Sequence, residues 1–213
     1  MRNIQFTFIL AFLIFNSYCQ DTIRIKTKES EISFGTFNTV NESNKVNINP
    51  SISGYLGDYY FENRYNYEAP NCASINVGKR IFKNIKHLEI IPMGGLVFGS
   101  FKGITAELQT SLDYRKYTFS TDNQFSYEYT QPDKSIYLNW TVARYKVTNS
   151  FRIGVTTVLS EQLNQCAKLD KGVTVLILLK TWSARFYAFN YDTEKRYYWL
   201  SLRYTIRGKL KRE

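Results

Sequence analysis

Hydrophobic and polar residues alternate along most of this chain with a period of two, most clearly over residues 104–117. Successive side chains of a β-strand point to opposite faces, so this segment predicts a strand with one apolar and one wet face. A helix would instead distribute the charged residues around its circumference. The apolar face holds Ile104, Ala106, Leu108, Thr110, Leu112 and Tyr114, and the wet face holds Thr105, Glu107, Gln109, Ser111, Asp113 and Arg115.

The same alternation recurs along the chain and predicts about ten antiparallel strands, with about eight to twelve compatible with the pattern. Segment 198–206, for example, places leucine and tyrosine opposite Ser201 and Arg203. No apolar stretch after Cys19 reaches the length of a membrane-spanning helix. The predicted strands cover residues 54–68, 72–82, 88–99, 104–117, 119–130, 135–146, 150–160, 171–180, 183–191 and 195–206.

The connections between these strands alternate between tight and longer ones. Outer-membrane barrels have short periplasmic turns and longer outer loops. We therefore predict an all-β, antiparallel, up-and-down transmembrane β-barrel with an even number of strands and both termini on the periplasmic side. The tight connections cover 83–87, 115–118, 146–150 and 180–182, and the longer ones cover 69–71, 99–103, 130–135, 160–171 and 191–195.

Residues 1–19 have the three parts of a secretory signal peptide. Arg2 provides the positive start, residues 4–15 are mostly apolar, and Ser17 and Cys19 fit the small-residue positions before a cleavage site. A lipoprotein signal is the alternative, in which Cys19 would carry the lipid. Both interpretations predict export.

The exported chain divides into a polar N-terminal leader over residues 20–50 and a β-barrel over residues 51–213, which ends in a short basic tail. The formal net charge of +10 is compatible with binding to nucleic acid or to lipid phosphates. Because an exported protein rarely meets nucleic acid, we expect outer-membrane lipids, lipopolysaccharide or an envelope protein complex as partners. The expected location is the outer membrane.

Alternation alone does not say which face lies inside, since a secreted, soluble lipocalin-like binding barrel has the same period with an apolar interior. Aromatic residues near the strand ends, such as Tyr114, Tyr117, Tyr127 and Tyr129, are typical of the membrane interface. The wet faces also carry long side chains of both charge signs, which suit a polar lumen. The predicted lumen network comprises Glu62, Arg64, Arg80, Glu107, Asp113, Arg115, Glu128, Arg152, Arg185 and Arg203.

The sequence contains no recognisable catalytic constellation, and we predict that the chain is not an enzyme. His87 is the only histidine, and it falls in a predicted tight turn without the partner that general-base catalysis requires. No Gly-rich phosphate loop leads from a strand into a helix, and no cysteine and histidine spacing resembles a zinc site. We therefore expect neither a cofactor nor a metal.

Two short motifs carry a resemblance to known proteins. The segments Arg64-Tyr65-Asn66-Tyr67-Glu68 and Ile91-Pro92-Met93-Gly94-Gly95-Leu96-Val97-Phe98-Gly99 resemble a family of small, largely uncharacterised bacterial outer-membrane β-barrels. The similarity covers residues 51–204. It implies a fold and a location but no activity. Many such barrels end in an aromatic residue, whereas this chain continues past Tyr204 into its basic tail.

The function predicted first is structural: a small outer-membrane barrel, acting as an interaction protein or as a subunit of an envelope assembly. The alternatives are a narrow pore or carrier for small or lipidic solutes, and the secreted binding barrel. Cys72 and Cys166 remain after signal cleavage, and the predicted topology places both at the outer end of the barrel. An even cysteine count in an oxidising compartment makes a disulfide between them one outcome to test.

Overall fold

The computed structural model describes residues 30–40, 46–82 and 87–208, and these residues form one closed antiparallel β-barrel of 12 strands. A two-residue strand, β5 (Ile81–Phe82), follows β4 along the chain and pairs with the same neighbour, β6. The staves of the barrel are β1 (Ser30–Val40), β2 (Val46–Leu56), β3 (Tyr59–Tyr65), β4 (Cys72–Lys79), β6 (Leu88–Gly99), β7 (Gly103–Tyr114), β8 (Tyr117–Glu128), β9 (Ile136–Lys146), β10 (Phe151–Gln162), β11 (Lys168–Leu178), β12 (Trp182–Phe189) and β13 (Tyr197–Gly208).

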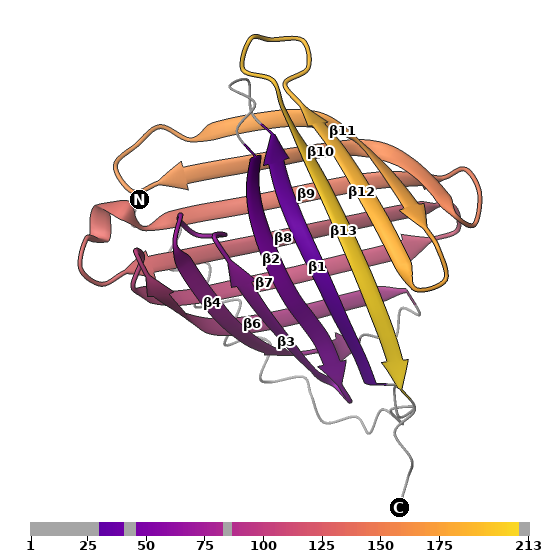
Figure 1. Cartoon of the computed structure of the whole chain (residues 1–213), viewed down its shortest axis with the longest axis horizontal. Coiled ribbons are helices and arrows are strands. Elements are labelled where there is room, and N and C mark those ends of the chain that lie inside the picture. The colour runs from indigo at the N-terminus through magenta and orange to yellow at the C-terminus, as the bar shows by residue number, and fades with distance from the viewer. Residues whose placement is uncertain (1–29, 41–45, 83–86, 209–213) are drawn as a thin grey trace, which may run out of the picture.

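Each strand pairs with the next one along the chain, and β1 pairs with β13 to close the barrel. The closing pair runs from Ser30 opposite Gly208 to Val40 opposite Tyr198. In Figure 1, β1 lies directly beside β13, and the strands tilt strongly around the barrel. Closure leaves no open sheet edge, which is the condition for a sheet to lie in lipid.

The strand number corrects the prediction of about ten, because the segment predicted as a polar leader contributes β1 and the first half of β2. The outward positions of these strands are apolar, with Ile32, Phe34 and Ile48 exposed. Their inward positions are mostly serine, glycine and asparagine, and Pro50 interrupts the strand pattern. These small and polar inward residues weaken the alternation of hydrophobic and polar positions. The sequence of β1 and β2 therefore resembles a polar segment, although both form strands of the barrel.

The two ends of the barrel differ in their connections, as predicted. One end has tight turns, including residues 57–58, 115–116 and 179–181. The turn at 57–58 divides the predicted strand 54–68. Gly57 in this turn has a φ of +62°, which residues other than glycine rarely adopt. The other end has longer connections, including residues 129–135 and 190–196. β1 begins and β13 ends at the tight-turn end. We call the opposite end the long-loop end.

Most side chains of the described strands that face the lumen are polar, and most of those that face outward are apolar. On β7, Thr105 and Glu107 are buried in the lumen, whereas Ile104 between two inward residues is 42% exposed. This is the reverse of a lipocalin-like barrel, whose interior is apolar, so the soluble alternative is wrong for this fold. Large exposed apolar residues recur on the outer surface of every stave, as a membrane barrel requires.

Exposed aromatic residues gather at both ends of this apolar surface. Tyr117 and Tyr145 lie in contact at the tight-turn end, with ring centroids 5.5 Å apart. Tyr127 and Tyr129 pair in the same way at the long-loop end, 5.9 Å apart. Such rings form the two interface girdles of a membrane barrel. Within the described ranges no helix is long and apolar enough to cross a membrane.

Candidate functional site in the barrel lumen

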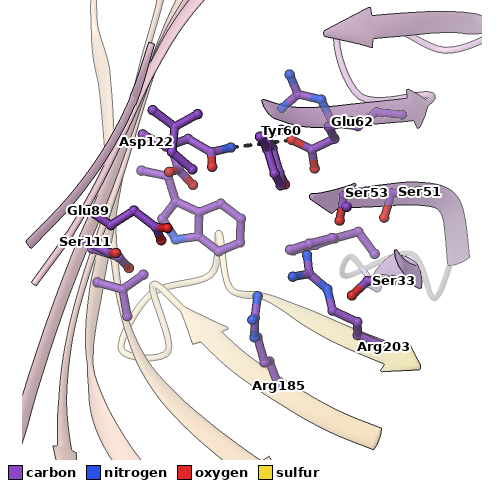
Figure 2. A pocket seen from close by; sticks show the side chains of 18 of the residues that line it. Ser33, Ser51, Ser53, Tyr60, Glu62, Glu89, Ser111, Asp122, Arg185 and Arg203 are labelled. Atoms are coloured by element: carbon purple, nitrogen blue, oxygen red, sulfur yellow. Dashed lines mark hydrogen bonds between the residues drawn. The ribbon is translucent and has the colours of Figure 1, made fainter. Parts of the chain in front are cut away.

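The lumen contains a cavity of about 310 Å³ that lies toward the tight-turn end. Its lining combines serine and other small polar residues with charged groups of both signs (Figure 2). Phe37, Tyr67 and Trp140 border it on the side of the long-loop end. The charged residues that line it are Glu31, Glu62, Arg64, Glu89, Asp122, Arg144, Arg185 and Arg203.

One wall of the lumen, formed by β3, β4 and β6–β8, is predominantly acidic, and we call it the acidic wall. At its centre the Arg64 guanidinium binds the Glu107 carboxylate, with Nη2 and Oε2 2.7 Å apart. The side chain of Gln109 donates to both Glu107 and Glu62, over 2.8 Å and 3.4 Å. Asp122 lies on the neighbouring strand β8. Burial makes the Arg64 ion pair important, because removing one partner would leave an uncompensated charge.

The connection from β3 to β4 turns into the lumen and joins the acidic wall. Asn66 has a φ of +58°, which ends the strand and redirects the chain inward. The Tyr67 ring then lies 4.1 Å from the Arg64 guanidinium carbon. Burial raises the pKa of the Tyr67 phenol well above its usual value, so the hydroxyl stays protonated. Glu68 lies 3.8 Å from Arg64 and accepts a hydrogen bond from Gln124.

The opposite side of the lumen carries arginines, and we call it the basic wall. Arg144 on β9, Arg185 on β12 and Arg203 on β13 all line the cavity. Arg144 donates a hydrogen bond to the Tyr187 hydroxyl over 2.9 Å. Within the described part of the chain, none of the three lies within 4.0 Å of a carboxylate oxygen. In Figure 2, Arg185 and Arg203 reach into the cavity from one side, and Asp122 and Glu62 face them from the other.

An aromatic cluster fills the basic-wall side of the lumen toward the long-loop end. Trp140 contacts Tyr187 and Trp199 edge to face, with both centroid distances 5.1 Å. Phe189 is fully buried and stacks on Tyr197 at 4.8 Å. Trp140 and Tyr187 border the cavity, whereas Phe189 and Trp199 lie beyond it. The cavity therefore gives way to packed aromatic side chains in this direction.

The structure brings together only part of the predicted lumen network. Glu62, Arg64 and Glu107 lie in the acidic wall, and Arg185 and Arg203 lie opposite. Two further pairs form near the tight-turn end, outside the central cluster. They join Arg80 to Glu89 over 2.7 Å and Arg152 to Asp113 over 3.7 Å.

Two predicted members do not belong to the network. Arg115 is exposed in the turn between β7 and β8, with a φ of +55°, because the strand ends at Tyr114. Glu128 is buried at the long-loop end and accepts hydrogen bonds from the backbone of Lys102 and Thr130. Alternation gave Glu128 the correct face but not its position along the barrel axis, and it continued the strand past its actual end to Arg115.

Several residues of the lumen were not among those predicted from the sequence. Asp122 shares the inward face of Gln124, Ser126 and Glu128, and Arg144 shares that of Trp140. Both could have been found by continuing the alternation from a neighbour. Tyr67 could not, because alternation puts it on the face opposite to Glu62 and Arg64, whereas it lies beyond the end of β3 in a connection that folds inward.

Cys72 and Cys166, for which a disulfide was one of the two possibilities left open by the sequence, are both free in the structure. Cys72 is buried, and its thiol donates a hydrogen bond to the Ala69 carbonyl over 2.8 Å. Cys166 is exposed in the connection between β10 and β11, which the strand order places far around the barrel from β4. Both cysteines lie at the long-loop end of the barrel, but they belong to strands on different sides of it.

The remaining expectations from the sequence concern His87, a metal site and the signal peptide. His87 is exposed in a turn next to β6, and its carbonyl accepts a hydrogen bond from the Asp113 amide. No group of three or more His, Cys, Asp and Glu in ranges 30–40, 46–82 and 87–208 could hold a metal ion. The predicted signal peptide and Cys19 lie outside the described residues.

Comparison with known proteins identifies related folds only at the level of structure. No protein-family model matches the chain, and no curated protein matches its sequence. Among solved structures, the KdgM porin matches with a TM-score of 0.60 at 13% identity, over 81% of this chain and 98% of the porin. The NanC porin matches with a TM-score of 0.59 at 9% identity, over 84% of this chain and 100% of the porin. The chain therefore has the fold of an outer-membrane porin-type barrel.

Proposed function

We propose that this chain is a narrow outer-membrane channel for small polar solutes. The observation that carries the proposal is a cavity lined by charged residues inside a closed barrel whose outer surface is mostly apolar. A purely structural barrel gains nothing from arginines that have no ion pair, because burying a charge without a partner is costly. A lumen that admits solutes gives such groups a role.

The size of the lumen limits what could pass. A volume of about 310 Å³ is at the small end of the range for ligand sites. The aromatic cluster and the inward-folded residues Tyr67 and Glu68 narrow the path toward the long-loop end. We therefore expect passage of single small molecules and exclusion of large hydrated solutes.

The structural neighbours support a channel in general terms. One of them is described as the KdgM porin in complex with disordered oligogalacturonate, an acidic sugar polymer. That ligand belongs to that protein. In this chain the lumen carries an acidic wall as well as a basic one, so we do not carry over a preference for polyanions.

A structural or interaction role is the second candidate, favoured by the aromatic packing around Trp140 and Phe189. In that case the barrel would act through its surface, by contact with outer-membrane lipids, lipopolysaccharide or other envelope proteins. The exposed apolar residues and aromatic girdles suit lipid contact in both models.

Conductance of the purified barrel in planar bilayers separates the two candidates. The channel model predicts small, steady conductance steps together with exclusion of disaccharides from reconstituted vesicles. A folded barrel that gives no conductance above the protein-free bilayer would favour the structural role. Large steps and sugar uptake would contradict a narrow lumen.

A further inference from the structure

We infer that the lumen cavity is a binding site for small zwitterions, molecules that carry an ammonium group at one end and a carboxylate at the other. The inference deepens the proposed channel function, which supplies the route by which a solute reaches the cavity. It rests on the placement of charge around the barrel.

The cavity charges that have no ion pair among the described residues occupy separate arcs of the strand order. The cavity carboxylates without an ion pair among the described residues, Glu62 and Asp122, lie on β3 and β8. The other two are neutralised, Glu31 by Arg207 and Glu89 by Arg80. The cavity arginines of the basic wall lie on β9, β12 and β13. Since strand order runs once around the barrel, Asp122 on β8 lies nearly opposite Arg203 on β13, whereas Arg144 lies on β9, the strand next to β8. Figure 2 shows this opposition for Arg185 and Arg203 against Asp122 and Glu62.

The basic wall has free capacity to bind a carboxylate. Arg144 is only 9% exposed, and its Nε has no hydrogen-bond partner among the described residues. The Nε of Arg185 is also buried and without a partner there. Guanidinium groups bind carboxylates through short, charge-assisted hydrogen bonds. A carboxylate between these side chains would also relieve the repulsion between neighbouring arginines.

The acidic wall has a complementary capacity for a cation. Arg64 neutralises Glu107 directly, but Asp122 has no ion pair within the described ranges. Glu62 is buried, and Gln109 is its hydrogen-bond donor at 3.4 Å. An ammonium group can reach several carboxylate oxygens from this side of the cavity.

These two capacities favour a zwitterion over either simple ion. An anion is attracted by the basic wall and repelled by the acidic wall. A cation is attracted by the acidic wall and repelled by the basic wall. A zwitterion aligned across the lumen gains from both walls without adding net charge. The cavity volume suits a molecule of about one dipeptide.

The test uses four nearly isosteric probes that differ only in charge. Glycylglycine is the zwitterion, N-acetylglycine lacks its ammonium group, glycylglycinamide lacks its carboxylate, and N-acetylglycinamide lacks both. Vesicles that contain the purified full-length barrel report permeability, and calorimetry on the detergent-solubilised barrel reports binding without a need for transport. We expect glycylglycine to bind about tenfold more tightly than N-acetylglycine or glycylglycinamide, each of which loses one charge-assisted contact, and to exceed N-acetylglycinamide, which loses both, by a larger factor.

Substitutions assign the two ends of the probe. Arg203→Gln should abolish the preference for glycylglycine over glycylglycinamide, and Asp122→Asn should abolish the preference over N-acetylglycine. The exposed residues Arg115→Gln and Asp133→Asn remove the same charges outside the cavity and should leave both preferences unchanged. Heat-modifiable migration in detergent gels confirms that each variant is folded.

The possible outcomes separate this inference from the channel proposal. Binding of glycylglycine without permeation would refute the channel and keep the site. Permeation without charge preference would keep the channel and overturn the site. Tighter binding of N-acetylglycine than of glycylglycine would also overturn it, because the lumen would then be an anion site. Equal effects of Arg203→Gln and Arg115→Gln would overturn it as well.

Discussion

The two walls of the lumen differ in whether their buried arginines form ion pairs. On the acidic wall, Arg64 is held by Glu107 and Glu68, and the neighbouring Arg80 is paired with Glu89. On the basic wall, Arg185 and Arg203 have no ion pair among the described residues and instead face open cavity. The difference in ion pairing distinguishes charges that stabilise the fold from charges that are available to bind a solute. Paired charges should matter for stability, and unpaired ones for selectivity.

The largest effect is expected for Arg64→Met. The substitution keeps much of the side-chain volume but leaves Glu107 and Glu68 buried without their cation. Breaking a buried pair in this way costs about 3–5 kcal/mol of unfolding free energy. Urea unfolding of the barrel in lipid vesicles, followed by tryptophan fluorescence, measures the loss. A loss below about 1 kcal/mol would mean that the ion pair is not structural.

Trp140→Ala should have the next largest effect, because it removes the centre of the aromatic cluster. We expect a loss of about 3 kcal/mol, at the lower end for tryptophan truncation, since one side of the ring already borders the cavity. The variant should also raise single-channel conductance. Unchanged conductance in a folded Trp140→Ala barrel would show that the aromatic cluster does not limit the pore.

Tyr187→Phe tests the hydrogen bond that Arg144 of the basic wall donates to a neutral group, the Tyr187 hydroxyl. It removes the hydroxyl that accepts from Arg144 and keeps the ring contacts with Trp140. A hydrogen bond to a charged group contributes about 1.5 kcal/mol at the lower end of its range. The same unfolding assay applies, with Tyr117→Phe on the lipid-facing surface as the control. Equal losses in the two variants would contradict a specific role for the Arg144 contact.

Arg185→Gln should change stability least, by less than about 1 kcal/mol. Its guanidinium has no carboxylate partner within the described ranges and lies near Arg144 and Arg203, so its removal relieves repulsion. A destabilisation comparable to that of Arg64→Met would remove the distinction between the two walls.

The fold could be predicted from the sequence to the extent that side chains alternate in polarity. The staves from β6 to β13 mostly follow that pattern, because exposed apolar residues recur on their outward faces. An exception is the hydrogen-bonded group of Thr121, Asn123, Asn139 and Thr141 on the outward face of β8 and β9. β1 and β2 were assigned to a leader because Ser33, Gly35 and Ser51 give little contrast on their inward face. Twelve strands rather than about ten is the consequence.

The site was less predictable, because alternation assigns a residue to a face but not to a height or a partner. Glu128 and Arg203 are both charged residues that alternation assigns to the inward face of a strand. In the structure, Glu128 binds the backbone of a connection, and Arg203 lines the cavity. Tyr67 enters the lumen only because Asn66 turns the chain inward at the end of β3. Such tertiary placement is set by register and by connections, which a period of two does not encode.

The reversal potential of the reconstituted channel across a KCl gradient tests the difference between the walls most directly. Removal of one positive charge from the basic wall by Arg203→Gln should shift the potential toward cation selectivity, while Arg115→Gln in an exposed turn should not. The account also requires that Arg203→Gln leave the unfolding free energy within about 1 kcal/mol of the wild type. An unchanged reversal potential in a folded Arg203→Gln channel would contradict the claim that the unpaired arginines act on solutes.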